Sequence, residues 1–348
     1  MIGENTKKDP GVSRPDAPLA PDSTRDPALY TRPGMIPDQI GALIERLRAN
    51  IQRVFIGNQE AVNRLICALL ARGHVLIEDV PGVGKTVLAT ALARSISGTF
   101  SRIQLTPDML PSDVLGVSIY DRQTGEFNFK RGPIFANIVL ADEINRTTPR
   151  TQSALLESMN EATVSVEGRV IPLEQPFIVV ATQNPYEFEG TYLLPENQLD
   201  RFLVRISLGY PEPDDEARVI ELRPAEAPLH ELKPVLGASD VLTLQGAVDR
   251  VRLDRSLIDY IIALAAATRR SDQLQIGLSP RGTLALAQAA RATALMGGRD
   301  YCIPEDVIDN IIAVAAHRVV SRAYLQTGDM RVSMQVLERI KETVPSPA

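Results

Sequence analysis

The chain has 348 residues, of which 44% are hydrophobic and 23% charged, and its formal net charge is −6. This composition is typical of a soluble globular protein and excludes a largely disordered chain, a collagen-like repeat and a small disulfide-stapled fold. The acidic balance and the absence of tryptophan disfavour a protein that holds nucleic acid through its phosphates or by stacking on the bases.

Residues 1–37 carry seven of the 25 prolines and few residues that could enter a core. This pattern indicates a disordered extension. The first residues, MIGENTKKDP, lack the apolar region of a secretory signal. No apolar run approaches the roughly 18 residues of a membrane-spanning helix. We therefore expect a cytoplasmic protein that meets a membrane only through a partner.

Residues 38–210 alternate between helical and strand patterns. Such alternation predicts an α/β domain, in which a mostly parallel sheet is sandwiched by helices. Two stretches of period-two alternation predict inserted hairpins at 117–129 and 163–170. The expected strands are 74–77, 100–105, 138–141, 177–182 and 203–208, and the expected helices are 40–55, 62–69, 88–92 and 148–161.

After Tyr210-Pro211-Glu212-Pro213 the strand signal disappears and helical patterns fill the chain. Prolines and polar residues over 223–240 indicate a linker. We expect a second, all-helical domain over 211–348. Its predicted helices are 214–222, 241–251, 256–269, 283–296, 304–320 and 333–344.

A glycine loop, PGVGKT at residues 81–86, stands between an expected strand and an expected helix. Glycines let backbone N–H groups face a phosphate, a lysine reaches the β- and γ-phosphates, and a threonine hydroxyl suits Mg²⁺. The first glycine of the usual GxxxxGK[ST] pattern is Asp79 here. The candidate nucleotide-binding residues are Ile56, Gly57, Pro81, Gly82, Val83, Gly84, Lys85, Thr86 and Val87.

Two carboxylates, Asp142 and Glu143, follow the apolar residues Ile138–Ala141 at a strand end. One crossover beyond a glycine loop, Asp142 suits a metal held through its water shell, and Glu143 suits a general base for an attacking water. Asn184 follows the next strand and can orient that water. Arg201 precedes another strand and Arg281 opens a helix, where it could reach back to phosphate. Read alone, Arg201 also suits a surface arginine or a salt bridge to Asp200, and Arg281 also suits an exposed arginine at a helix start.

The motifs PGVGKT, VLADEINR, VVATQNP, LPENQLDRF and LSPR stand in the order of those in AAA+ ATPases. The sequences of the segments EDVPGVGKT and DEINRTTPRTQSALLESMNE resemble those of the MoxR family in particular. The resemblance spans about residues 40–320. It implies the P-loop AAA+ fold with a C-terminal helical lid, and ATP and Mg²⁺ as cofactors.

Carried over residue by residue, the resemblance implies that Lys85 and Thr86 belong to Walker A, and Asp142 and Glu143 to Walker B. It further implies Asn184 as sensor 1, Arg201 as the arginine finger and Arg281 as sensor 2. Thr86 and Asp142 are the implied metal ligands. The resemblance also implies self-association into a ring-shaped hexamer that remodels or activates a protein client, often one with a von Willebrand factor A domain.

Two other functions stay open. Relatives with similar inserted hairpins include replicative helicases, so a nucleic-acid motor or loader is the alternative. The acidic net charge argues against a nucleic-acid motor, and so does the small number of basic residues at the expected hairpins. These are Arg122, Lys130, Arg131 and Arg169. An ATP-sensing scaffold with negligible turnover is a minor third possibility, and the presence of Glu143 and Arg201 argues against it.

Overall fold

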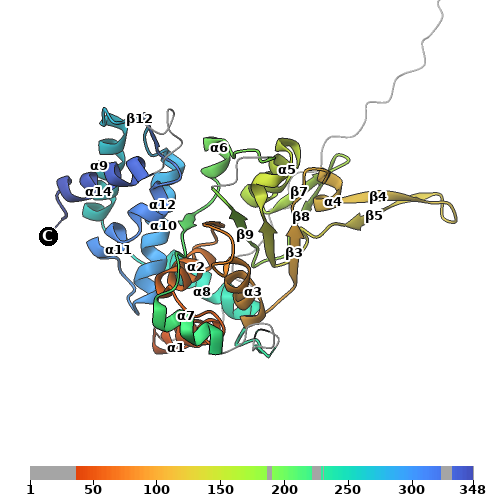
Figure 1. The fold of residues 1–348 in the computed structure, drawn as a ribbon, viewed down its shortest axis with the longest axis horizontal. Coiled ribbons are helices and arrows are strands. Elements are labelled where there is room, and N and C mark those ends of the chain that lie inside the picture. Colours follow the sequence, from red (N-terminus) through yellow and green to blue (C-terminus); the bar gives the residue numbers. More distant parts are fainter. Residues whose placement is uncertain (1–36, 186–189, 222–228, 230, 323–330, 348) are drawn as a thin grey trace, which may run out of the picture.

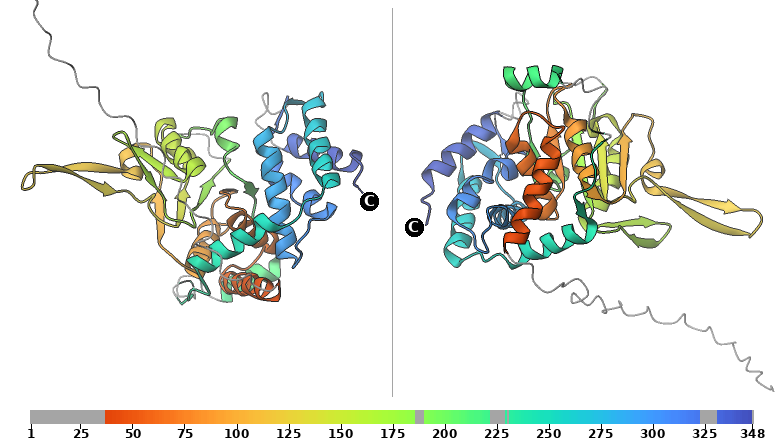
Figure 2. Two further views of the ribbon diagram at one scale, coloured as in Figure 1. Left: turned by 180° about the vertical axis from the view of Figure 1, so that it is seen from behind. Right: turned by 90° about the horizontal axis from the view of Figure 1, so that it is seen from below.

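The structure is a computed structural model that describes residues 37–185, 190–221, 229, 231–322 and 331–347. The predicted disordered extension and part of the predicted linker lie outside these residues. The described chain has an α/β part, with a long hairpin projecting from one side and a group of C-terminal helices on the opposite side (Figures 1 and 2).

A five-stranded sheet, in which all neighbouring strands pair in parallel, forms the centre of the α/β part. The carboxyl ends of the strands therefore share one edge, which is where parallel α/β sheets bind ligands. In spatial order the strands are β10 (Val204–Ile206), β1 (Val75–Glu78), β9 (Ile178–Gln183), β6 (Ile138–Asp142) and β3 (Phe100–Gln104).

Alternate residues of the strands enter two hydrophobic clusters, one on each face of the sheet. On one face, side chains such as Val75 and Ile77 meet α1 (Pro37–Gln52), α2 (Gln59–Leu70) and α3 (Lys85–Ser95). On the other face, Leu76 belongs to the cluster of α4 (Pro111–Leu115) and α5 (Pro149–Glu161). The predicted sandwich is confirmed.

Two antiparallel hairpins interrupt this framework, as the alternation of their sequences predicts. The longer one pairs β4 (Gly116–Asp121) with β5 (Glu126–Arg131) and projects far from the body (Figure 1). The shorter one pairs β7 (Thr163–Val166) with β8 (Arg169–Pro172). Ser118 Oγ donates to Glu167 Oε2 at 2.7 Å, so the two hairpins touch.

The C-terminal part is helical, with two departures from the expected pattern. The helix predicted over 304–320 is broken at Asp309–Asn310, because the buried Asn310 side chain donates to Asp306 O and to Thr293 Oγ1. The described residues of this part also include three short strands, each too short to produce a visible alternation. The helices are α7 (Pro213–Glu221), α8 (Ala238–Arg250), α9 (Arg255–Arg270), α10 (Pro280–Met296), α11 (Pro304–Ile308), α12 (Ile311–Ala315) and α14 (Arg331–Thr343).

Two of the later elements make contacts with the α/β part. Strand β11 (Leu236–Gly237) pairs with β2 (Ile96–Ser97), directly after α3. Gln245 of α8 donates to Leu69 O of α2 at 2.7 Å. The remaining pair, β12 (Leu274–Ile276) with β13 (Val320–Ser321), lies within the C-terminal part.

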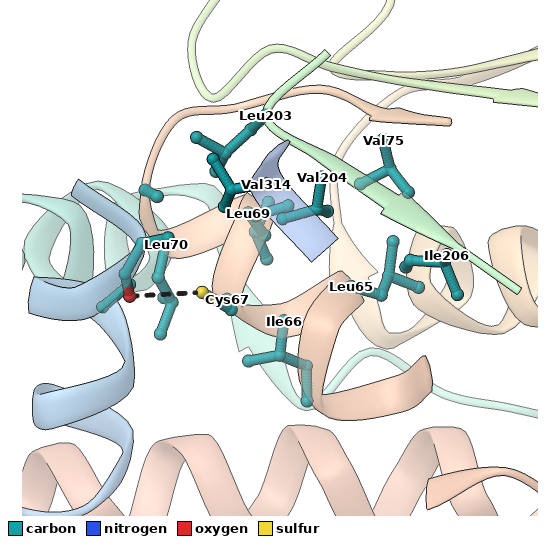
Figure 3. Close-up of a cluster of buried hydrophobic side chains, with 14 of the residues drawn as sticks. Leu65, Ile66, Cys67, Leu69, Leu70, Val75, Leu203, Val204, Ile206 and Val314 are labelled. Atoms are coloured by element: carbon teal, nitrogen blue, oxygen red, sulfur yellow. Dashed lines mark hydrogen bonds between the residues drawn. The ribbon is translucent and has the colours of Figure 1, made fainter. Parts of the chain in front are cut away.

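Helix α2 is the hub of the larger core. Leu65, Leu69 and the thiol of Cys67 lie between β1, β10 and the C-terminal helices (Figure 3). Cys67 Sγ donates to Ala289 O of α10 at 3.6 Å. The α/β part and the C-terminal helices therefore share one continuous core.

Among the described residues, no helix combines the length and apolar character needed to cross a bilayer.

His74 gives the fold a testable pH dependence. It is buried before β1, where Nε2 donates to Met159 O (2.8 Å) and Nδ1 accepts from the N–H of Val179 (3.0 Å). Burial lowers its pKa to about 4, and the bond to Met159 opposes this shift. A depressed histidine pKa stabilises the fold fully above the unfolded value near 6.5. That stability is lost as pH falls toward 4, at about 1.4 kcal/mol per pH unit.

We expect His74→Asn to take up about one proton fewer on unfolding between pH 6.5 and 4. The Asn oxygen can accept from Val179 but does not titrate. The free energy of unfolding measured across this range should fall less steeply in the variant. An unchanged slope would show that His74 does not titrate in this window.

Candidate functional site

The phosphate loop follows β1 at the carboxyl edge of the sheet. Gly82 and Gly84 adopt left-handed backbone conformations, with φ of 87° and 95°. A Cβ on Gly84 would approach the ring of Phe55 within 3.5 Å, and no atom lies within 4 Å of a Cβ built on Gly82. Lys85 Nζ donates to Asp79 O (2.6 Å) and Gln183 O (3.2 Å). The loop therefore has open backbone and a lysine at the start of α3.

Asp79, where the usual motif has glycine, anchors this loop to the end of β10. Its Oδ2 accepts from Ser207 Oγ (3.0 Å) and from the N–H groups of Leu208 (2.7 Å) and Gly209 (2.8 Å). Its Oδ1 accepts from the N–H of Val80 at 2.8 Å. Burial raises its pKa, but these bonds outweigh the burial and lower it overall. A glycine could make none of these contacts.

The Ile56–Gly57 break lies beside the same loop. Asn58 caps α2 through the N–H of Ala61 (3.1 Å) and donates to Leu208 O at 3.2 Å. A Cβ on Gly57, whose φ is 124°, would meet Pro211 at 3.9 Å. The predicted nucleotide-binding segments 56–57 and 81–87 are thus brought together through Asn58, Asp79 and the end of β10.

The carboxylates of Asp142 and Glu143 end β6, near Lys85. Asp142 Oδ1 accepts from Thr182 Oγ1 (2.6 Å), and Oδ2 accepts from Arg102 Nη2 (2.7 Å). Burial lowers the pKa of Lys85, and nearby carboxylates, including Asp142 and Glu143, oppose this shift. Lys85 is therefore a partly buried cation with several carboxylates near it.

Glu143 has a left-handed backbone, with φ 57° and ψ 55°. A non-glycine residue persists there only where its surroundings hold it. Here its N–H donates to Thr182 Oγ1 at 2.9 Å, and its Oε2 accepts from Gln104 Nε2 at 2.9 Å. Arg146 Nε lies 3.3 Å from the same oxygen. The carboxylate is therefore held by the side chains of Gln104 and Arg146.

Asn184 follows β9 at the same edge, where its backbone oxygen accepts from Asn145 Nδ2 at 3.3 Å. Gln183, just before it, pairs with Glu78 of β1 and donates to its carboxylate at 2.7 Å. The structure therefore brings Lys85, Asp142, Glu143 and Asn184 to neighbouring strand ends.

Arg201 and Arg281 lie at the opposite end of the strands. Arg201 precedes β10, and the next residues pair with the amino end of β1, where the N–H of Leu203 donates to His74 O at 2.8 Å. Strand β1 spans four residues, so at about 3.3 Å per residue the phosphate loop lies about 13 Å away along the strand. An arginine side chain does not span that separation.

The two arginines lie on segments that contact each other, because Ser279 Oγ, two residues before Arg281, lies 3.1 Å from a carboxylate oxygen of Asp200, the residue before Arg201. Burial lowers the pKa of Arg201, Arg281 lowers it further, and Glu157 of α5 opposes the shift. Two neighbouring cations raise each other's free energy unless an anion lies between them. The pair therefore forms a positive site that is separate from the phosphate loop of its own chain.

The residues present fit Mg²⁺. A hydroxyl at Thr86 and a carboxylate at Asp142 are the hard oxygen donors that this cation prefers. The bonds from Thr182 and Arg102 occupy part of the acceptor capacity of the Asp142 carboxylate, which has about four lone-pair sites.

Sequence reasoning missed four side chains that shape these two sites. Arg102 and Gln104 lie on one face of β3, beside β6, and bind the two carboxylates. Their alternation in the run Phe100–Gln104 was a usable signal, since period-two spacing places both on one face. His317 and Arg318 reach the segment around Arg201, and no local pattern indicates this.

Two family models match the chain. One, described as ATPase family associated with various cellular activities (AAA), matches residues 74–204. The other, described as AAA lid domain, matches residues 266–340.

Relatives match over most of their length. An uncharacterized protein, YeaC of Bacillus subtilis, is 51% identical over 78% of this chain and 84% of its own. Chaperone MoxR1 of Mycobacterium tuberculosis is 43% identical over 87% of this chain and 82% of its own. The crystal structure of a candidate ATPase from Cytophaga hutchinsonii matches with a TM-score of 0.81 and 35% identity. It covers 90% of this chain and 97% of the other.

Asp79 gives a stability test of the loop anchor. Asp79→Asn places an amide against the N–H groups of Leu208 and Gly209. Since a lost hydrogen bond to a charged group costs about 1.5–3 kcal/mol, the free energy of unfolding should fall by at least about 1.5 kcal/mol. Chemical unfolding measures this. Asp214→Asn, at an exposed position of α7, is the matched control and should change stability by less than about 0.5 kcal/mol. Equal effects of the two variants would contradict the anchor.

Proposed function

This chain belongs to the MoxR family of AAA+ ATPases, and from that premise we propose that it hydrolyses ATP at sites shared between two subunits and uses the cycle to remodel a protein client. The observation that carries the proposal is the separation of its functional groups. The phosphate loop and the carboxylate pair stand at one end of β1, and the arginine pair stands at the other.

The phosphate loop binds ATP in this proposal. The N–H groups around Gly82 and Gly84 and the amino end of α3 cradle the phosphates, and Lys85 meets the β- and γ-phosphates. The segment Ile56–Gly57 borders the nucleotide, together with Pro81, Val83 and Val87. Thr86 and Asp142 would hold Mg²⁺, which would supply charge neutralisation at the phosphates.

Glu143 and Asn184 act on the water that hydrolyses ATP. Glu143 polarises the attacking water as general base, and its orientation by Gln104 supports that role. Asn184, at the neighbouring strand end, orients the same water. Little covalent chemistry is needed, because phosphoryl transfer depends mainly on positioning and on charge stabilisation.

Arg201 and Arg281 act on the nucleotide of the adjacent subunit. They are adjacent cations beyond the reach of their own phosphate loop, so a second copy of the chain is the natural source of the missing anion. Repeating this head-to-tail contact closes a ring. We propose a hexamer with the α/β unit over residues 38–210 as its nucleotide-binding domain and residues 211–348 as its lid.

A protein client suits the exposed surface of the β4–β5 hairpin. Val117, Ile119, Tyr120 and Phe127 are 47–67% exposed there. Apolar and aromatic side chains on a projecting element favour contact with protein over contact with a phosphate backbone. A von Willebrand factor A domain protein is the client class that we propose, with activity in the cytoplasm.

Glu143→Gln should bind ATP with an affinity near that of the parent and hydrolyse it at least about 10²-fold more slowly, the usual contribution of a general base. Steady-state phosphate release and calorimetric ATP titration measure the two quantities. Glu161→Gln, at the exposed end of α5, is the matched control and should hydrolyse ATP normally. A hydrolysis rate within twofold of the parent in Glu143→Gln would show that Glu143 is structural.

Mixing two inactive variants tests the shared site. A Lys85→Ala subunit loses its nucleotide-binding site but keeps Arg201. An Arg201→Ala subunit keeps its nucleotide-binding site but supplies no arginine to the site of its neighbour. Each alone should be nearly inactive, since an arginine finger contributes roughly 10³–10⁵ in rate. Mixed assemblies should recover part of the ATPase activity, because some interfaces pair an intact site with an intact arginine. Dilution below the assembly concentration should abolish the recovery.

Pull-down with differently tagged variants establishes that the two subunits assemble together. A co-assembled mixture that stays as inactive as its components would contradict the shared site.

A further inference from the structure

Arg318, three residues beyond α12, is buried against the backbone of residues 200–203. Its Nε donates to Asp200 Oδ1 at 2.8 Å, and its Nη1 donates to Leu203 O at 3.0 Å. Its Nη2 donates to Phe202 O and, at 3.3 Å, to Asp200 O. One guanidinium from the C-terminal part thus binds both residues that flank Arg201.

The cost of burying this charge indicates that its position matters. Arg318 is only 5% exposed. Burial lowers its pKa to about 10, and the carboxylate of Asp200 opposes the shift, so the group is protonated at neutral pH. A buried cation is tolerated where its donors are satisfied, and only the planar fork of arginine can serve several carbonyls at fixed angles.

Asp200 extends the same network to Arg281. Ser279 Oγ lies 3.1 Å and 3.2 Å from the two carboxylate oxygens of Asp200. The same hydroxyl accepts from the N–H of Gly282 at 3.0 Å and so caps α10, the helix that Arg281 opens. Asp200 therefore joins the segment of Arg201 to the helix of Arg281.

Close packing makes this network rigid. A Cβ on Gly282 would lie 3.0 Å from Arg318 Cδ and 2.4 Å from Leu278 Cδ1, so α10 approaches Arg318 as closely as a glycine permits. His317 Nε2 donates to Phe202 O at 2.9 Å. Leu203 and Val314 of α12 belong to one buried cluster (Figure 3).

We propose that Arg318 is the positioning residue of the shared site: by clamping residues 200–203, and through Asp200 and Ser279, it holds Arg201 and Arg281 as a pair facing the neighbouring subunit. This rests on the proposed trans role of Arg201. Arg318 is too buried to touch the nucleotide itself. It acts by fixing where the half-buried Arg201 and the exposed Arg281 stand, and it makes their position depend on how the C-terminal helices pack.

Arg318→Lys in the full-length chain tests the clamp, because lysine keeps the charge but loses the fork. Misplacing a catalytic group by about 1 Å can cost about 10²-fold, so kcat for ATP should fall by 10-fold to 10²-fold. KM for ATP should stay within about twofold, since the phosphate loop is untouched. Asp200→Asn, which removes the partner carboxylate with little change in shape, should give the same split and carries the test if Arg318→Lys fails to fold.

Arg64→Lys is the matched control. Arg64 of α2 also bridges the α/β part to the C-terminal helices, where its Nη1 donates to Asn310 Oδ1 at 2.6 Å, but it does not touch residues 200–203. Its kcat should stay within about twofold of the parent. An equal loss in Arg64→Lys and Arg318→Lys would overturn the proposal, because general loosening would then explain both. A normal kcat in both Arg318→Lys and Asp200→Asn would also overturn it.

Complementation distinguishes the positioning role of Arg318 from the shared site on which it rests. Lys85→Ala subunits carry an intact clamp and an intact Arg201, so they should restore activity to co-assembled Arg318→Lys subunits as they do to Arg201→Ala. If Arg201→Ala is rescued and Arg318→Lys is not, Arg318 acts on its own subunit and the positioning role is wrong. If neither is rescued, the shared site itself fails, and the role of Arg318 fails with it.

Discussion

The structure depends on the parallel pairing of β1 with β10. That pairing fixes the phosphate loop at one end of the two strands and Arg201 at the other. Because the strands are short and buried, neither end can approach the other without breaking the sheet. In the proposed function, a chain built this way holds half of a phosphate-transfer site at each end, and the two halves complete each other between subunits.

The two ends are nevertheless connected within one chain. Asp79 ties the phosphate loop to the carboxyl end of β10, and Arg318 ties the C-terminal helices to its amino end. Between them, Arg205 of β10 pairs with the buried carboxylate of Glu78 on β1. Contacts at both ends and along the length of β10 thus attach this strand to the phosphate loop, to β1 and to the C-terminal helices.

The sequence predicted most of the fold, because its signals are local. The buried strands are apolar runs, PGVGKT interrupts one strand–helix junction, and two hairpins show clear alternation. The structure differs from the prediction where contacts between distant residues determine the local conformation. Asn310 breaks a helix by bonding to Asp306 O and Thr293, and β11, β12 and β13 are too short to be recognised from their patterns.

The candidate site divides in the same way. Lys85, Asp142, Glu143 and Asn184 follow from strand ends that a parallel sheet must bring together. Asp79 was noticed as a departure from the motif, but three of its four acceptor contacts depend on the end of β10, about 130 residues later. Arg318 was not found at all, since its partners lie more than 100 residues away and its sequence neighbourhood resembles an ordinary helix end.

The central claim, that each nucleotide is served by arginines of the adjacent subunit, can be observed directly. A structure of the assembled Glu143→Gln variant with ATP and Mg²⁺ would trap the site before hydrolysis. We predict the Arg201 guanidinium within hydrogen-bond distance of the γ-phosphate of the neighbouring subunit, with Arg281 beside it. An assembly in which Arg201 contacts no phosphate, or contacts only that of its own subunit, would contradict the account.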